Sequence, residues 1–225
     1  QLSREYITVG QFPETRNISD VEKTHEYISE SVIGKILNDC IHIFKIEKTD
    51  EFKLTAYQLI NNAGSIFELK NIGREVGVSF LTLEKYMEYL KEGYVVEVLY
   101  KYHKSLVRRG RILKKIYIPC INFICALNHF KASHVLEVPQ AFGKIIENAT
   151  YNILNQKYKG NQVANVLSFW RQGEKEIDFL VNEKGHKLAV EVKFSKKVTP
   201  KDALFLAKYV GQKKLKFGII VTKDE

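Results

Sequence analysis

The stretch from Trp170 to Ser195 constrains the fold more than any other part of the chain, because its side-chain pattern predicts a β-hairpin. Residues 176–181 and 188–194 alternate between apolar and other side chains with a period close to two. Residues 182–185 between them, Asn-Glu-Lys-Gly, have the composition of a turn. Two neighbouring strands of one sheet are therefore expected here.

Charged residues interrupt the apolar pattern of this hairpin. Asp178 lies in the middle of the first strand, and Glu191 and Lys193 are two positions apart on the same face of the second. Charges at such positions cost desolvation free energy, which a bound cation can offset. We expect the three side chains to converge at one edge of a sheet. The alternative is a surface ion pair between Glu191 and Lys193 on an edge strand, which would contribute little.

The composition fits one or two globular domains with a polyanionic partner. The chain has 225 residues, of which 45% are hydrophobic, and a formal charge of +9. Its cysteines (Cys40, Cys120 and Cys125) have no CxxC spacing, which favours a reduced, cytoplasmic setting. No apolar run approaches the roughly 18 residues that span a bilayer, so no membrane partner is expected.

Residues 1–50 are interpreted as a helical linker or lid. Apolar spacing from Val21 to Phe44 predicts one or two helices, interrupted at Gly34, and Gly10 to Glu14 is interpreted as a turn that makes a surface connection. The chain begins with Gln and its single Met is Met87. We therefore expect a piece of a longer protein, from which an N-terminal domain is missing.

Residues 51–118 predict a winged helix-turn-helix. The third helix is expected to be capped by Ser79 and to end at Gly93. The helices are expected over residues 54–63, 66–76 and 80–91, and the strands over 94–102 and 112–118. In such a module the third helix can enter a DNA major groove.

The turn between those two strands is strongly basic and contains no acidic residue, which predicts contacts to DNA phosphates. The predicted nucleic-acid-binding residues are Lys101, Lys104, Arg108, Arg109, Arg111, Lys114 and Lys115. Against this, the candidate recognition helix carries Glu84, Glu88 and Glu92, which repel phosphate. Protein docking or oligomer formation by this module stays open as an alternative.

Residues 119–225 predict an α+β domain with the element order α-β-β-β-α-β. The expected helices cover residues 139–156 and 199–210, and the expected strands cover 162–170, 176–181, 188–194 and 217–222. Glu147 lies beside the buried face of the first helix, and Gly211 is expected just past the end of the second. Glu147 can also be interpreted as an ordinary helix-surface residue.

A helix Glu, a strand Asp and a Glu-x-Lys pair in this order resemble the PD-(D/E)xK nuclease superfamily. The ordered segments GQFPE, LKEGYVVEVLYKY, KKIYIP, IEN, WRQGEKEIDFLV and AVEVKFS resemble the C-terminal region of prokaryotic, archaeal-type AAA-family ATPases. In that family an ATPase module precedes a winged helix and a nuclease-like domain of unknown function. The resemblance implies that Glu147, Asp178, Glu191 and Lys193 are catalytic, and that the three acids hold Mg²⁺ for phosphodiester hydrolysis in DNA.

The chain departs from that family in two respects. It has no G-x-x-x-x-G-K-[ST] phosphate loop, so ATP is not expected to bind here and ATP chemistry would belong to the missing N-terminal ATPase domain. Residues 119–122 read Pro-Cys-Ile-Asn where many relatives have an Asp, which puts a local polar contact in question. A non-catalytic DNA- or protein-interaction module that regulates the ATPase remains the alternative, and a homo-oligomer remains open.

Overall fold

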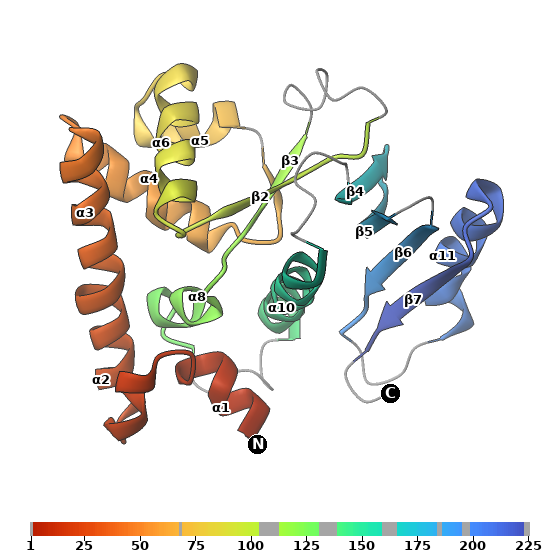
Figure 1. The fold of residues 1–225 in the computed structure, drawn as a ribbon, viewed down its shortest axis with the longest axis horizontal. Coiled ribbons are helices and arrows are strands. Elements are labelled where there is room, and N and C mark those ends of the chain that lie inside the picture. The colour runs from red at the N-terminus through yellow and green to blue at the C-terminus, as the bar shows by residue number, and fades with distance from the viewer. Residues whose placement is uncertain are drawn as a thin grey trace. The chain divides into compact units, whose positions relative to one another are not determined.

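The computed structural model describes residues 2–67, 69–103, 113–130, 139–158, 166–183, 186–194 and 199–222. The chain forms two units. One consists of Gln1–Val98 with Lys115–Val138, and the other of Leu99–Lys114 with Pro139–Glu225. Figure 1 shows their helices and strands, and the mixture of both agrees with the α+β class expected from the sequence. In the described part of the chain, no helix is long and apolar enough to span a membrane.

The first unit begins with short helices and one long helical run (Figure 1). The elements are α1 (Leu2–Val9), the 3₁₀ turn η1 (Pro13–Asn17), α2 (Val21–Glu26), the π-helical segment η2 (Tyr27–Ile33) and α3 (Gly34–Phe44). The interruption expected at Gly34 was wrong, because Gly34 has helical dihedrals and the run passes through it. Full burial of Ile28, Ile33 and Leu37 on this run offsets the cost of a helical glycine, about 1 kcal/mol.

The chain next forms three helices and a small three-stranded sheet. The elements are α4 (Thr49–Asn61), β1 (Ile66–Phe67), α5 (Leu69–Val76), α6 (Phe80–Glu92), β2 (Glu97–Tyr100) and β3 (Lys114–Tyr117). The strands are ordered β1-β3-β2. The helix expected from residue 66 instead begins at Leu69, because Gly64 takes a positive φ of 75° and donates its N–H to the carbonyl of Ile116.

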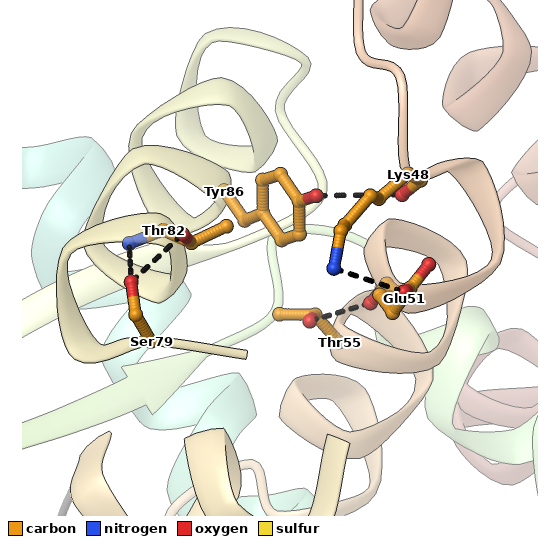
Figure 2. A network of polar contacts seen from close by, with 6 residues as sticks. All are labelled: Lys48, Glu51, Thr55, Ser79, Thr82 and Tyr86. Carbon is orange, nitrogen blue, oxygen red and sulfur yellow. Dashed lines mark hydrogen bonds and ion pairs between the residues drawn. The ribbon is translucent and has the colours of Figure 1, made fainter. Parts of the chain in front are cut away.

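Helix α6 begins where the sequence predicted and is fixed onto α4 (Figure 2). The Ser79 hydroxyl accepts a hydrogen bond from the backbone N–H of Thr82 at 3.1 Å, which satisfies one of the free donors of the first turn. One turn later, the Tyr86 hydroxyl donates to the carbonyl of Lys48 at 3.3 Å. The Tyr86 ring also meets Phe52 of α4 edge-on, with centroids 5.2 Å apart.

Helix α8 (Ile121–Leu127) is almost wholly buried and is joined to the turn that follows α1. Gln11 and Asn122 exchange hydrogen bonds: the Gln11 N–H donates to Asn122 Oδ1 at 2.7 Å, and the Asn122 N–H donates to Gln11 Oε1 at 2.9 Å. The side chain of Gln11 thereby caps the first turn of α8. The turn expected from Gly10 to Glu14 is confirmed, and through Gln11 it also makes a specific contact with α8.

The second unit follows the element order expected from the sequence. Its elements are α10 (Pro139–Tyr158), β4 (Leu167–Gln172), β5 (Lys175–Glu183), β6 (His186–Val192), α11 (Pro200–Lys213) and β7 (Phe217–Val221). The sheet order is β4-β5-β6-β7, antiparallel except for the parallel pair β6 and β7. Helix α11 continues through Gly211, which was expected just past its end, and stops before Lys214, whose φ is 51°.

Helix α10 covers one face of this sheet. Phe142 meets Phe194 edge-on with centroids 4.6 Å apart, and Tyr151 lies 6.3 Å from Phe179. Leu180, the residue that follows Phe179, belongs to the opposite face.

Helix α11 covers that opposite face. Its Leu206 and Tyr209 share a buried cluster with Leu180 of β5 and Ala189 of β6, which are paired across the two strands. The sheet is thus packed on both faces, and polar side chains on it are partly withdrawn from water.

Candidate functional site

The candidate site lies where β5 and β6 part. Their pairing is recorded from Glu183 and His186 as far as Phe179 and Val190, whereas β6 stays paired with β7 through Val192. Beyond that point, the Asp178 side chain takes over from the strand ladder. Its Oδ2 accepts a hydrogen bond from the N–H of Val192 at 2.9 Å. Asp178 therefore holds the two strands together where their backbone pairing has ended.

Glu191 brings a second carboxylate to the same place. The residue is only 9% exposed, and its Oε1 lies 2.9 Å from the Nζ of Lys193. Its Oε2 is buried and makes no hydrogen bond to any residue that the structure describes. A buried carboxylate oxygen with unused acceptor capacity is costly in free energy unless a donor or a cation reaches it.

The surroundings of Glu191 favour its protonated form. Burial is the main cause and the negative charge of Asp178 the next, and together they raise the pKa of Glu191 from an ordinary 4.5 to about 7. The ion pair with Lys193 acts in the opposite direction but does not cancel the rise. A buried carboxyl group whose pKa is raised in this way, next to a second carboxylate, is typical of a site that takes up a positive charge.

Lys193 connects the buried carboxylate to the surface. Its side chain is 38% exposed, against 11% for that of Glu191. The alternative of a surface ion pair on an edge strand was wrong in two respects, because Glu191 is buried and β6 lies between β5 and β7. The ammonium of Lys193 is thus held beside the acids and can still meet an incoming anion.

Glu147 is not gathered into this group as a third ligand. It is a half-buried residue of α10, the helix that packs on the Phe179 face of the sheet. Among the residues that the structure describes, no three His, Cys, Asp or Glu side chains form a group that could hold a metal ion. Of the four predicted catalytic residues, the contacts above place Asp178, Glu191 and Lys193 together.

The predicted basic wing is only partly within the described residues. Lys104, Arg108, Arg109 and Arg111 lie outside them. Within them, Lys101 is half-buried, while Lys114 and Lys115 are 8% and 2% exposed.

The burial of Lys114 and Lys115 corrects the expectation that both contact phosphates from the surface. Strand β3 lies between β1 and β2 and is buried at every position, so side chains on both of its faces are enclosed. The Lys114 ammonium lies 5.8 Å from the ring centroid of Tyr100, a cation–π arrangement. Charge counted along the sequence does not distinguish an enclosed lysine from an exposed one.

Sequence reasoning missed two features of this unit. The first is the hydrogen bond from the Val192 N–H to Asp178. No sequence pattern indicates it, because every residue except proline has a backbone donor. The second is a cavity of about 270 Å³ beside Trp170.

Comparisons with known proteins match both parts of the chain to families without an assigned function. Residues 1–133 match the model of a domain of unknown function, DUF8612, and residues 142–225 match that of another, DUF4143. No curated protein and no solved structure matches the chain. The DUF8612 model covers more than half of the sequence, and the chain therefore belongs to the DUF8612 family, with a DUF4143 region following it.

Proposed function

We propose that this chain is the DNA-binding, Mg²⁺-dependent nuclease-like part of an AAA-type ATPase, with phosphodiester hydrolysis as its reaction. DUF4143 occurs in proteins associated with AAA-type ATPases, which supports the ATPase context. The formal charge of +9 supports a polyanionic partner. ATP hydrolysis would be carried out by another part of the protein, since this sequence has no phosphate-binding loop.

The order of the elements supports both halves of this proposal. The run α4-β1-α5-α6-β2-β3 with strands ordered β1-β3-β2 is the arrangement expected of a winged helix. The run α10-β4-β5-β6-α11-β7 is the α-β-β-β-α-β order of the PD-(D/E)xK nucleases that the sequence resembles. These orders support the two folds, and the function depends on the site.

The observation that carries the proposal is the buried Oε2 of Glu191 beside Asp178. Mg²⁺ is commonly bound through one or two carboxylates, with water and substrate phosphate as the other ligands. Two carboxylates on adjoining strands fit that requirement without Glu147. A cation there would also offset the cost of burying the charge of Glu191 and the repulsion from Asp178, the two causes that raise the pKa of Glu191.

Each of the three residues has a distinct role in this proposal. Asp178 and Glu191 would hold the ion, which when bound supplies positive charge against the scissile phosphate and a more acidic water. The partly exposed ammonium of Lys193 would orient the attacking water and stabilise negative charge on the phosphate. Asp178 also accepts the hydrogen bond from the Val192 amide. The same side chain would therefore bind the ion and position the strand that carries Glu191 and Lys193.

The test is cleavage of labelled single-stranded, duplex and branched DNA in the presence of Mg²⁺ or Mn²⁺. Lys193→Ala and Glu191→Gln should abolish metal-dependent cleavage, and Lys216→Ala should not, because Lys216 is an exposed lysine outside the site. The proposal fails if the wild-type chain cuts none of the substrates, or if all variants cut equally well.

A non-catalytic interaction module is the second candidate, favoured by one observation. The described residues contain no three-acid group for a metal ion, and Lys193 already neutralises part of the charge of Glu191. DNA binding whose affinity falls with salt, without cleavage under any metal, would support this module. Binding of a partner protein with no affinity for DNA would indicate docking instead.

A further inference from the structure

The second unit contains a cavity of about 270 Å³ that the proposed cleavage chemistry does not use. It lies on the α11 face of the sheet, and residues of β4, β5 and β6 contribute to it together with Tyr102, which follows β2. Its lining combines aromatic rings with amide and ammonium groups, from Tyr102, Trp170, Asn182, Lys187, Tyr209 and Lys213. Apolar walls with a few polar groups are typical of a small-ligand site.

The aromatic wall is built by packing and is therefore fixed. The rings of Trp170 and Tyr209 have centroids 4.8 Å apart, and Trp170 is also stacked on Phe205 at 6.1 Å. Tyr209 is 5% exposed, whereas Trp170 and Tyr102 are half-buried and so keep part of their surface available. Tyr102 is held in place by its backbone N–H, which donates to the carbonyl of Phe169 in β4.

The polar part of the cavity is positively charged and includes amide and hydroxyl groups. Lys187 and Lys213 are exposed at its rim, and the Lys187 ammonium lies 5.9 Å from the ring centroid of Tyr102. Burial raises the pKa of Tyr209 to about 12, so its hydroxyl stays protonated at neutral pH. Asn182 adds an amide, which both donates and accepts hydrogen bonds.

The cavity and the acid pair are built on the same two strands. Leu180 and Asn182 of β5 line the cavity together with Lys187, which pairs directly with Asn182 on β6. Asn182 is four residues from Asp178, which corresponds to about 13 Å along a strand. A strand of DNA bound at both places would span that distance with two or three nucleotides.

We propose that this cavity binds a nucleobase of single-stranded DNA, with Lys187 and Lys213 at the adjoining phosphates. The assignment rests on the proposed function for its substrate class, and deepens it by requiring an unpaired base near the cut. Flat aromatic surface next to exposed lysines is the combination by which proteins bind single strands without sequence preference. A purely apolar ligand would leave the two rim lysines without a role.

The chain offers a direct probe, because Trp170 is its single tryptophan. The experiment titrates the full chain, in EDTA and low salt, with oligo(dT) of about ten nucleotides, within the range of known single-strand sites. Binding is followed by the anisotropy of a labelled oligonucleotide, and base stacking by the emission of Trp170. We expect saturable quenching of Trp170 that follows the anisotropy change.

Three further arms decide what occupies the cavity. Inorganic polyphosphate of equal charge should compete for binding without quenching Trp170, since it has no base. Duplex DNA of the same length should quench much less, and dTMP should quench only weakly because it offers one phosphate. If polyphosphate quenches Trp170 as strongly as oligo(dT), or if saturating oligo(dT) leaves the emission unchanged, the proposal is overturned.

Variants test the rim without disturbing the core. Lys187→Ala and Lys213→Ala change exposed side chains and should each weaken oligo(dT) binding by about three- to tenfold. Lys208→Ala removes the same charge from an exposed position of α11 outside the lining and should leave the affinity nearly unchanged. If all three changes weakened oligo(dT) binding equally, only the net charge would matter, and the assignment of the cavity as the binding site would be contradicted.

The outcome is separable from that of the cleavage assay, because no metal is present. Quenching without cleavage in the Mg²⁺ assay would keep the base pocket and reject the nuclease. Metal-dependent cleavage that requires Lys193, with no quenching of Trp170, would keep the nuclease and reject the pocket.

Discussion

Lys193 and Glu191 form an ion pair of 2.9 Å in which only one carboxylate oxygen takes part. The other oxygen of Glu191 is buried without a hydrogen bond from any described residue, and Asp178 is its charged neighbour. The pair therefore stabilises the ionised form of Glu191 incompletely, which is why its pKa stays raised.

Stability should fall as pH rises through the titration of Glu191. With a folded-state pKa of about 7 and an ordinary value of 4.5, the folded chain binds more protons than the unfolded chain between these values. The stabilisation is complete below pH 4.5 and lost above pH 7, and amounts to on the order of 3 kcal/mol. In urea unfolding from pH 4.5 to 8, the free energy of unfolding should fall less for Glu191→Gln than for the wild-type chain. Identical pH profiles for the two chains would count against this titration.

Mg²⁺ should raise the melting temperature of the wild-type chain, and EDTA should reverse the rise. Binding needs ionised Glu191, so the rise should be larger at pH 8 than at pH 6. A ligand at about 100 times its dissociation constant stabilises by roughly 2.7 kcal/mol. Glu191→Gln should lose the effect, whereas Glu174→Gln, which changes an exposed carboxylate, should keep it. An equal rise in both variants would indicate binding elsewhere.

Asn122 should be among the polar residues on which stability depends most. It is fully buried, accepts from the Gln11 N–H and donates to the carbonyls of Tyr6 and Ile7. Asn122→Ala leaves these groups buried without partners and should cost about 3 kcal/mol in urea unfolding. Asn122→Asp should be at least as harmful at neutral pH, because a carboxylate would face two carbonyl oxygens.

The matched control for Asn122 is Asn128, which is exposed at the end of the same helix. Asn128→Ala should cost less than about 1 kcal/mol, since water can replace its hydrogen bonds. If both variants lost a similar free energy of unfolding, burial would not be what makes the Gln11–Asn122 contact important for stability.

Two glycines of the second unit should respond to alanine in opposite directions. A Cβ at Gly218 of β7 would lie 2.9 Å from Cγ of Leu206, so Gly218→Ala forces α11 away from the sheet and should cost about 1–3 kcal/mol. A Cβ at Gly211 meets nothing within 4 Å, and Gly211→Ala in the same helix should stabilise by about 0.5–1 kcal/mol. Thermal unfolding of the two variants provides the measurement, and a shift of the same sign in both would refute this packing.

Local sequence signals predicted the elements whose stability is local. Asp20 begins α2 by accepting from the N–H of Glu22, and Ser79 caps α6 as expected from its type and position. The helix expected from residue 66 and the helix end expected at Gly211 were wrong, because a glycine does not by itself determine where a helix begins or ends. At Ile66 a partner strand 50 residues away decides the outcome, through the bond from Gly64 to Ile116.

The sequence by itself determined that Glu191 and Lys193 share one strand face and that Asp178 lies on the neighbouring strand, because a strand alternates with a period of two. Only the tertiary structure decided which charges are withdrawn from water. Burial depends on what packs over a residue, so Glu191, Lys114 and Lys115 are enclosed while Lys193 reaches the surface. The same packing of α11 on the sheet created the cavity beside Trp170, from residues that are far apart in the chain.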